Sequence, residues 1–333
     1  MLTDTQTTPK PTSARQNLQR NPKGTTEGAN RPDVYALITE RVIGFLESDI
    51  IPWKKPWNGG CEGFPKNIVT RRPYSGINAF LLAMTPYESP YFLTFKQSRD
   101  MGGFVKKGEK GFPVIYFNKT LVTKEDKETG ETATESHGFL RYYTVFNFEQ
   151  CVGILPLASE VIPVKDFHPI EECETIRQGY RGAPEIIQRE QRAYYSPSLD
   201  IINMPKPESF DSPEGYYATL FHEMTHSTGH TSRLKREGIT DLHHFGDPVY
   251  SKEELIAEMG AAFLCAHAGI EPVTLQNSAS YIAGWLSKLR SDKKLVIHAA
   301  AAAQRAANYI QGRSEAPQSL PGGLGEVGMS TGG

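Results

Sequence analysis

Residues 214–230, EGYYATLFHEMTHSTGH, decide the fold of the second half of the chain. Their apolar residues recur at helical spacing, which predicts an amphipathic helix with one buried side. The pattern HExxH lies on this helix, and because residues four apart share one helical face, His222 and His226 can bind a single divalent ion. Glu223 would then lie beside the open coordination position as a base toward a water molecule. The segment therefore predicts a catalytic metal centre.

A catalytic zinc site has three protein ligands and an open fourth position, so one more ligand is needed. The longer pattern HExxHxxGxxH is not met, because Ser232 stands where its third histidine would be. Residues 252–258, KEELIAE, predict a second helix on which Glu254 and Glu258 are four apart. Glu254 follows His226 by 28 residues, which allows an antiparallel helix to return a carboxylate to the metal. We expect Glu254 as the third ligand and Glu258 as the acceptor of a hydrogen bond from a ligand imidazole.

Several further residues near the motif are candidates for the third ligand. They are Glu253 and Glu258 on the same predicted helix, and His243 and His244 before it. His230 could be a ligand, a hydrogen-bond donor to the reacting group or a surface residue. Because imidazole and carboxylate donors suit Zn²⁺, the expected cofactor is one zinc ion, with Mn²⁺ or another divalent ion as the alternative.

The composition of the 333 residues limits the class of protein. Lys and Arg number 36 against 38 Asp and Glu, a net charge of -2, so any affinity for nucleic acid must come from local clusters of positive charge. The same balance excludes an acidic mimic of DNA. The four cysteines are far apart, so neither a disulfide framework nor a cysteine zinc ribbon is expected. No apolar run reaches the roughly 18 to 20 residues of a membrane span, and we expect a soluble cytoplasmic protein with no membrane partner.

Changes in composition along the chain predict five segments and an α+β fold. Residues 1–31 are rich in Thr, Pro, Asn and Gly and predict a disordered, mildly basic arm, whereas 313–333 predict a disordered tail. A small α/β domain is expected at 32–154 and a proline-punctuated linker at 155–169. A largely helical domain with a short edge sheet is expected at 170–312.

Individual elements can be predicted within these two domains. Asp33 should cap a helix that ends before Pro52. Two strand-like runs on either side of 120–138 predict a long hairpin with a mobile tip. In the second domain, further helices are expected at 252–268 and 278–312.

The stretch 51–119 is basic and aromatic in a chain whose total charge is negative. It holds eleven Lys or Arg against four acidic residues, a local charge of +7, together with thirteen aromatic residues. Single-stranded nucleic acid requires this combination, because cations contact phosphates and flat rings stack on bases. The alternative is that the rings form the core of a small domain and the cations its ordinary surface. The residues predicted to contact DNA are Trp53, Lys54, Lys55, Trp57, Arg71, Arg72, Tyr74, Lys106, Lys107 and Lys110.

The order of several segments across roughly 32–312 resembles the ArdC antirestriction proteins of conjugative plasmids. The segments include RPDVYALITERVIGFLESDIIPWKKPW at 31–57, YTVFNFEQC at 143–151 and SKEELIAEMGAAFL at 251–264. The resemblance implies a single-stranded-DNA-binding front domain similar to the TraC primases of conjugative plasmids. It also implies a zincin-like metallopeptidase domain related to SprT-type proteases.

The resemblance also implies roles for individual residues. His222 and His226 match the family's metal pair, and Glu223 matches its catalytic carboxylate. The spacing of Glu254 and Glu258 is similar to that in thermolysin-type gluzincins, where a carboxylate follows the third ligand by four residues. SprT-type proteases use a third histidine, which leaves the choice of third ligand open.

Two functions from different classes agree with these observations. The first is an antirestriction protein that binds single-stranded DNA and carries a metal-dependent peptidase site, with restriction enzymes or DNA-bound host proteins as substrates. It would protect incoming plasmid DNA during conjugation. The alternative is a non-catalytic protein that coats single strands and whose metal site is structural or vestigial. A nuclease is a third, disfavoured hypothesis, because the Asp-rich paired-metal sites typical of nucleases are not seen in the sequence.

Overall fold

The computed structural model describes residues 33–54, 64–125, 132–154, 169–240, 248–270 and 279–313. All of these residues belong to one compact unit, Asp33–Gly333. The predicted arm at 1–31 lies outside the described residues, and so do the predicted linker and tail apart from Pro169 and Arg313. The five-segment division along the sequence therefore stays a prediction.

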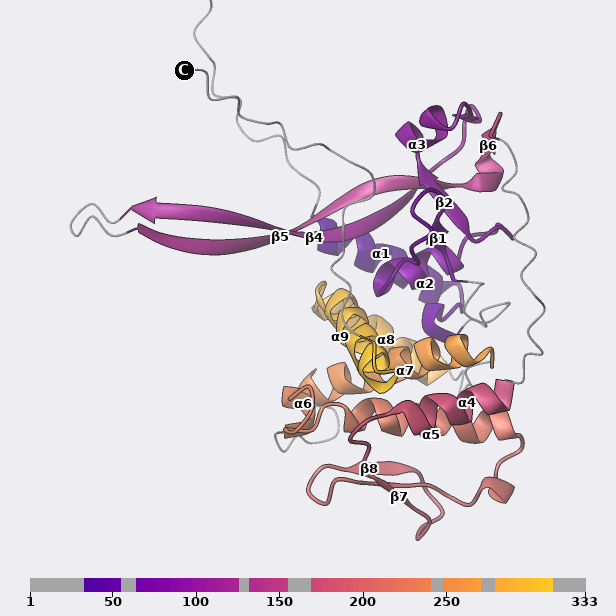
Figure 1. Cartoon of the computed structure of the whole chain (residues 1–333), viewed down its shortest axis with the longest axis vertical. Coiled ribbons are helices and arrows are strands. Elements are labelled where there is room, and N and C mark those ends of the chain that lie inside the picture. Colours follow the sequence, from indigo (N-terminus) through magenta and orange to yellow (C-terminus); the bar gives the residue numbers. More distant parts are fainter. Residues whose placement is uncertain are drawn as a thin grey trace, which may run out of the picture. The chain divides into compact units, whose positions relative to one another are not determined.

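The front half is built around a four-stranded sheet in the order β1-β2-β5-β4 (Figure 1). β1 and β2 are parallel, and the other neighbouring strands are antiparallel. β4 and β5 form the predicted long hairpin, but their pairing continues to Glu125↔Thr132, well into the stretch predicted as a mobile tip. Threonine and valine favour strands, so this polar stretch can extend the ladder. The strands are β1 (Lys66–Asn67), β2 (Tyr91–Thr94), β4 (Phe112–Glu125) and β5 (Thr132–Asn147).

Short helices and a second small sheet complete the front half. The predicted cap of the first helix, α1, is present, because Asp33 Oδ1 accepts from the backbone N–H groups of Tyr35 and Ala36 at 3.0 and 3.3 Å. α1 ends before Pro52, as predicted. The elements are α1 (Val34–Glu47), the 3₁₀ turn η1 (Pro52–Lys54), α2 (Ile77–Ala83), α3 (Phe95–Asp100), the paired strands β3 (Phe104–Val105) and β6 (Cys151–Val152), and η3 (Phe148–Gln150).

The second half is mainly helical, with a three-stranded sheet in the order β7-β9-β8. The helix predicted at 278–312 is two helices, because Asp292 Oδ1 accepts from the N–H of Lys294 at 2.8 Å and forms a turn between them. The elements are α4 (Pro169–Gly179), β7 (Glu185–Ile187), β8 (Tyr194–Ser196), β9 (Ile201–Asn203), η4 (Pro207–Ser209), α5 (Pro213–Ser227), α6 (Glu237–Thr240), α7 (Pro248–Ala268), α8 (Ala279–Ser291) and α9 (Leu295–Ile310).

The helices α5 and α7 pack closely because a glycine lies at their contact. A Cβ atom added to Gly260 would lie 2.7 Å from Oγ1 of the fully buried Thr225, so no larger residue fits without movement. α5 begins at a proline after Ser212, whose hydroxyl accepts from the N–H of Gly215 at 3.1 Å. The cap sets where α5 begins, and the close contact at Gly260 sets how α5 and α7 lie against each other. Together they determine which residues of the two helices face the predicted metal site.

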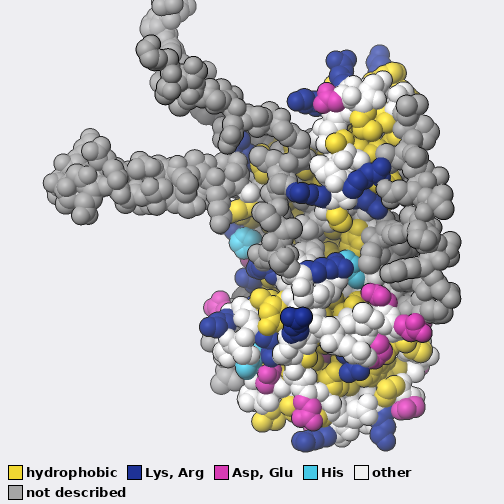
Figure 2. Space-filling view, viewed as in Figure 1, with side chains coloured by type: hydrophobic (Ala, Val, Ile, Leu, Met, Phe, Trp, Pro, Cys, Tyr) yellow, Lys and Arg dark blue, Asp and Glu magenta, His cyan; other side chains and the backbone are white. Residues whose placement is uncertain are grey.

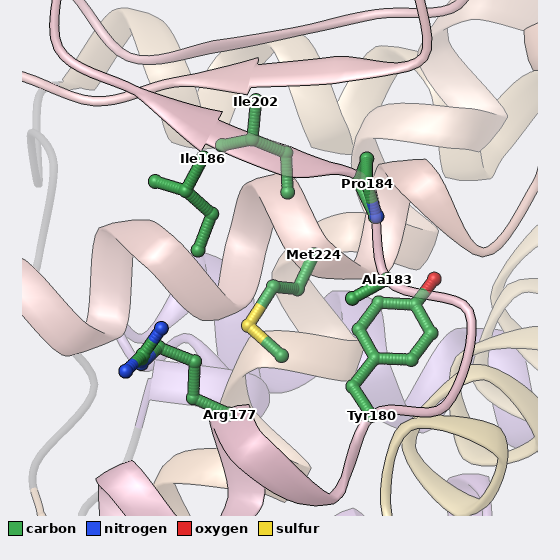
Figure 3. Close-up of a pocket in the computed structure, with 7 residues that line it drawn as sticks. All are labelled: Arg177, Tyr180, Ala183, Pro184, Ile186, Ile202 and Met224. Carbon is green, nitrogen blue, oxygen red and sulfur yellow. The ribbon is translucent and has the colours of Figure 1, made fainter.

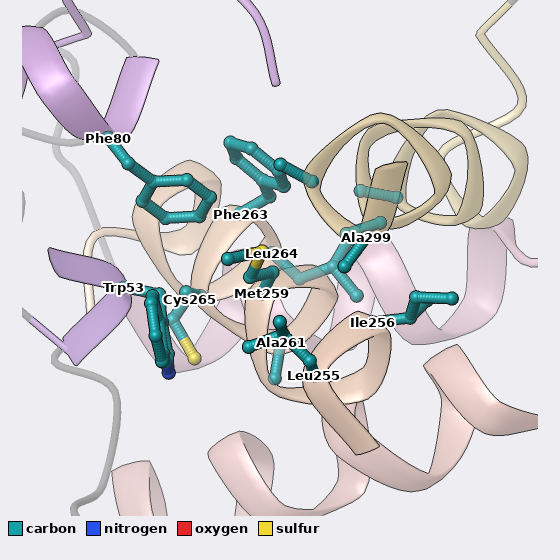
Figure 4. Packing of buried hydrophobic residues seen from close by; sticks show 14 of the residues in the cluster. Trp53, Phe80, Leu255, Ile256, Met259, Ala261, Phe263, Leu264, Cys265 and Ala299 are labelled. Atoms are coloured by element: carbon teal, nitrogen blue, oxygen red, sulfur yellow. The ribbon is translucent and has the colours of Figure 1, made fainter. Parts of the chain in front are cut away.

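One hydrophobic core joins the front half to the helical half. The rings of Phe80 on α2 and Phe263 on α7 have centroids 4.6 Å apart (Figure 4), and Trp53 meets Trp285 of α8 edge to face at 6.2 Å. The hydroxyl of Thr39 on α1 donates to the carbonyl of Lys293 at 2.7 Å. α8 and α9 thus complete a core that begins with α1 and α2, although these helices are far apart in the sequence.

Candidate metal centre and nucleic-acid interface

The structure brings the three predicted metal ligands together. Nε2 of His222 lies 3.1 Å from Nε2 of His226, and these atoms lie 3.7 and 3.5 Å from the carboxylate of Glu254. Ligand atoms about 2.0–2.1 Å from a tetrahedral zinc ion lie roughly 3.3 Å from one another. The three residues therefore fit one divalent ion with little rearrangement.

The exposure of these side chains suits a catalytic rather than a closed site. His226 is buried at the α5–α7 contact, whereas the side chains of His222 and Glu254 are partly exposed, so the donor atoms are reached from solvent. Glu223 follows His222 on α5 and is itself buried. A carboxylate next to an accessible donor set is the arrangement that a water-activating centre needs.

Glu253, rather than Glu258, lies behind a ligand imidazole. Its Oε1 is 3.2 Å from Nδ1 of His226, and Arg236 donates to the same carboxylate from Nε at 2.9 Å and from Nη2 at 2.6 Å. A proton on Nδ1 that is donated to Glu253 leaves the lone pair of Nε2 directed at the other two ligands. Arg236 and Glu253 therefore fix the tautomer and the ring orientation of His226.

The charges around His226 also shift its pKa. Burial lowers the pKa of the imidazole, but the hydrogen bond to Glu253 and the nearby carboxylates of Glu254 and Glu223 outweigh burial and raise it to about 9. For Glu253, burial raises the pKa, and the hydrogen bonds from Arg236 and His226 reverse this and hold it below its ordinary value. The site therefore concentrates negative charge, which favours a bound cation.

The predicted role of Glu258 differs from what the structure shows. Its Oε2 accepts from Nε1 of Trp53 at 2.8 Å and from the hydroxyl of Tyr281. Glu258 therefore joins η1 and α8 to α7, and it does not orient an imidazole. The sequence favours Glu258 because it follows Glu254 by four residues, as the carboxylate behind the third ligand does in thermolysin-type gluzincins. In the structure, α7 is rotated about its axis so that Glu253, and not Glu258, faces the ligand helix α5.

Glu253 and His230, which the sequence also offered as third ligands, lie away from the donor atoms. Glu253 is held by Arg236 on the Nδ1 side of His226. His230 lies against Ser232, with Nδ1 2.8 Å from the hydroxyl oxygen, and is not in the donor group. His243 and His244 fall outside the described residues.

An ion pair ties the end of α5 to the turn between β8 and β9. Arg233 binds the carboxylate of Asp200 and also donates to the carbonyl of Ser227 at 2.7 Å. Burial raises the pKa of Asp200, but the hydrogen bonds from Arg233 and Tyr195 outweigh burial and keep it below the ordinary value. The strand β8 is thereby held beside the helix that carries the metal ligands.

A small pocket lies on the opposite side of α5 (Figure 3). Its volume is about 200 Å³, and Met224 projects into it from α5. Met224 is two positions from each ligand histidine, so it faces about 160° away from them. The pocket is therefore separate from the metal centre. It is lined by Arg177, Tyr180, Ala183, Pro184, Ile186, Ile202 and Met224.

Of the rings predicted to stack on DNA, Trp53 is not available for that role, and Tyr74 is partly buried. Trp53 is only 1% exposed and lies in the core that joins the two halves. The ring of Tyr74 packs edge to face against the buried Phe92 at 6.4 Å. Composition could not separate core rings from surface rings, so the prediction for Trp53 is wrong, whereas that for the partly buried Tyr74 stays a prediction. Lys55 and Trp57 lie outside the described residues, and so does the side chain of Lys54.

The predicted cations, in contrast, lie on the surface. Arg71, Arg72, Lys106, Lys107 and Lys110 are all exposed. Lys106 Nζ donates to the carbonyl of Glu149 at 2.8 Å, and the guanidinium carbon of Arg71 lies 5.1 Å from the centroid of the Tyr91 ring. Figure 2 shows Lys and Arg side chains on the face above the helical half.

The structure also shows exposed rings that the sequence reasoning missed. Phe95 and Phe104 are 52% and 55% exposed, and Phe117 and Tyr142 near the hairpin are exposed to a similar degree. Their position in the sequence could have indicated this exposure. Phe95 and Phe104 each lie within two residues of a lysine, and they belong to short elements that cannot bury both faces.

The fold and the donor set define a zincin-like metallopeptidase domain, and comparison with known proteins agrees. The family described as "Zincin-like metallopeptidase" matches residues 178–302, and the "N-terminal domain of anti-restriction factor ArdC" matches 32–146. The metal-free crystal structure of the antirestriction protein ArdC from plasmid R388 is 38% identical, with a TM-score of 0.66 over 84% of this chain and 97% of that one. The Mn(II)-bound structure gives 36% and 0.65 over the same shares. The chain belongs to the ArdC antirestriction family.

Curated relatives extend this similarity. A DNA primase TraC of Escherichia coli is 35% identical over 289 residues, which are 82% of this chain and 26% of the primase. An uncharacterised protein of Sinorhizobium fredii is 30% identical over 300 residues, which are 86% of this chain and 94% of that protein. The chain thus spans about a quarter of the primase that it matches.

These findings confirm the predicted family and the α+β fold with a zincin-like second half. The Mn(II)-bound relative and the donor set both support a divalent metal. Within the described residues, no helix is long and apolar enough to span a membrane.

Proposed function

We propose that this protein protects incoming plasmid DNA from host restriction during conjugation, by binding single-stranded DNA and acting as a metal-dependent peptidase. The observation that carries the peptidase proposal is the set of three donor atoms at ligand spacing, with Glu223 beside it and Glu253 behind it. Restriction enzymes or DNA-bound host proteins in the cytoplasm are the proposed substrates. Zinc is the proposed metal, with manganese as the alternative.

Different residues of the chain would perform the separate steps of the proposed reaction. His222, His226 and Glu254 would hold the ion, which when bound supplies Lewis acidity toward a peptide carbonyl. Glu223 accepts a proton from the attacking water and returns it to the leaving amine. Glu253 keeps Nε2 of His226 available by accepting the proton of Nδ1. β8 is an edge strand that packs against α5, so a substrate peptide can pair with its backbone.

The proposed DNA contact lies in the front half. The exposed cations Arg71, Arg72, Lys106, Lys107 and Lys110 would bind phosphates, and affinity would fall steeply with salt. The front domain at 32–154 and the peptidase domain at 170–312 are the proposed functional divisions. The similarity to a primase that handles DNA supports this assignment of roles.

The decisive comparison is Glu223→Gln against wild type and Glu208→Gln, an exposed glutamate on η4 that is not among the three metal-donor residues. The readout is survival of plasmid DNA transferred into a restricting recipient, after equal binding of metal and single-stranded DNA has been verified. We expect Glu223→Gln to lose protection and Glu208→Gln to keep it, because only Glu223 can accept the proton. If Glu223→Gln protects as well as wild type, the peptidase proposal fails and the protein acts as a single-strand coat.

A further inference from the structure

Two phenylalanines in the front half are exposed in a way that the fold does not explain. Phe95 and Phe104 each leave more than half of their surface in solvent. A single exposed ring is ordinary, but large exposed apolar side chains on elements that pack together are typical of a binding surface. The two residues lie on α3 and β3, which pack against each other.

The backbone under both rings is fixed. Phe95 opens α3, where Thr94 and Gln97 form a capping box with bonds of 3.2 and 2.8 Å. Phe104 pairs with Val152 across β3 and β6, and directly opposed residues project to the same side, so an exposed valine lies next to the ring. Gly103 makes this possible, because a Cβ there would lie 2.5 Å from the carbonyl of Val152. Both rings are therefore carried on preorganised backbone.

Exposed cations lie on or next to the elements that carry these rings. Lys96 and Arg99 are exposed on α3, and Lys106 and Lys107 follow β3. The guanidinium carbon of Arg99 lies 5.7 Å from the centroid of the Phe95 ring. Figure 2 shows hydrophobic and basic side chains next to one another over α3 and β6.

The acidic groups on the same segments are fewer than the cations. They are Asp100 at the end of α3, Glu109, whose carboxylate accepts from Nε2 of Gln150 at 2.8 Å, and Glu149 just before β6, whose carboxylate accepts from the N–H of Ser89 at 2.6 Å. The surface formed by α3, β3 and β6, called here the α3–β3 surface, is therefore aromatic and net positive.

We propose that Phe95 and Phe104 are the base-stacking residues of the single-stranded-DNA site, with the surrounding cations contacting the phosphates. Rings on fixed backbone stack on unpaired bases of any sequence, and flanking cations follow the strand. In a duplex the bases are stacked on one another inside the helix, so they are not accessible for stacking on these rings. The inference rests on the proposed DNA binding and puts these two rings in the place of the buried Trp53 as its aromatic contacts.

The test is a set of leucine substitutions, which keep an apolar side chain and remove the ring. Phe95→Leu, Phe104→Leu and the double variant are compared with Phe117→Leu, a control of similar exposure on β4. Each full-length protein is titrated by fluorescence anisotropy with labelled oligothymidine and with an abasic oligonucleotide of the same length. Melting temperatures verify that all variants fold.

We expect each substitution on the α3–β3 surface to weaken oligothymidine binding by roughly 5- to 150-fold, because stacking contributes about 1–3 kcal/mol per base. Binding of the abasic strand and the salt dependence should stay unchanged. Lys106→Gln and Lys107→Gln should instead weaken both strands and lower the salt slope by roughly 0.7 each.

Three outcomes would overturn the stacking assignment while leaving DNA binding intact. They are wild-type affinity in the double leucine variant, an equal loss for the abasic strand, and an equal loss in Phe117→Leu. If wild-type protein binds neither strand, the proposed DNA binding itself fails, and the α3–β3 surface serves another partner.

Discussion

Replacing Glu253 by glutamine removes the charge behind a metal ligand and keeps the shape of the side chain. In the structure, Glu253 receives two hydrogen bonds from Arg236 and lies 3.2 Å from Nδ1 of His226. The amide of the variant keeps one oxygen that can accept from Nδ1. Its NH₂ group cannot accept from Arg236, so the ion pair is lost and the remaining hydrogen bond from Nδ1 goes to a neutral, weaker acceptor that holds His226 less firmly.

The size of the effect follows from burial and from the position of Glu253 behind the ligand. Loss of such a supporting contact weakens metal binding by about 10- to 100-fold, or roughly 1.4 to 2.7 kcal/mol. The side chains of Arg236 and Glu253 are only 11% and 4% exposed, so removing the counter-charge of the arginine costs up to about 3 to 5 kcal/mol of folding stability, although Arg236 keeps its hydrogen bonds to Thr228 and to the α5 backbone.

Metal affinity is measured by competition with a chromophoric chelator, using Zn²⁺ and Mn²⁺ in turn. Thermal unfolding with and without metal supplies a second readout, because an ion that binds only the folded state stabilises it according to its affinity. At a fixed free metal concentration, Glu253→Gln should therefore gain less stability than wild type.

The matched control is Glu258→Gln, the same change five positions further along α7. It removes the charge of the carboxylate that accepts from Trp53 and Tyr281 and leaves one amide oxygen to accept from them, so it should lower stability and leave metal affinity within about threefold. If Glu253→Gln binds metal as tightly as wild type, or if Glu258→Gln loses affinity instead, the reasoning about the His226 tautomer is refuted.

Two further predictions concern stability. Gly260→Ala should destabilise the fold by about 1 to 3 kcal/mol in denaturant titration, because its Cβ would overlap Thr225, and adding Thr225→Ala should recover part of the loss. Asp200→Asn should be less stable than wild type at neutral pH, because the lowered pKa of Asp200 contributes stability that is complete above the unfolded value of about 3.9 and is lost as pH falls through the folded value. A difference between the two proteins that stayed constant from pH 7 to pH 2 would contradict the second prediction.

Much of the metal centre could be predicted because the spacing of residues along a single helix determines which side chains lie on the same face. The helical period places His222 and His226 on one face, and a second helix at a suitable separation offers Glu254. The choice between Glu253 and Glu258 could not be made, because it depends on how α7 is rotated against α5. That rotation is set by a contact between distant residues and not by spacing along one helix.

The aromatic residues of the front half show the same limit. A ring beside lysines in the sequence can point to solvent or into a core, and only the partner elements decide which. The partner of Trp53 is α8, which begins more than 220 residues later. No local sequence pattern predicts the contact between Trp53 and α8. For this reason the sequence predicts Trp53, a core residue, as a DNA contact.

The bond between Thr39 and Lys293 has a consequence for synthesis of the protein. It spans 254 positions, so α1 and α2 leave the ribosome long before the helices that cover them. At about 5 to 20 residues per second, this interval lasts roughly 13 to 50 seconds. Throughout it, the apolar faces that α8 and α9 cover in the folded protein stay exposed on the nascent front half, and exposed apolar surface of this kind favours aggregation and chaperone binding.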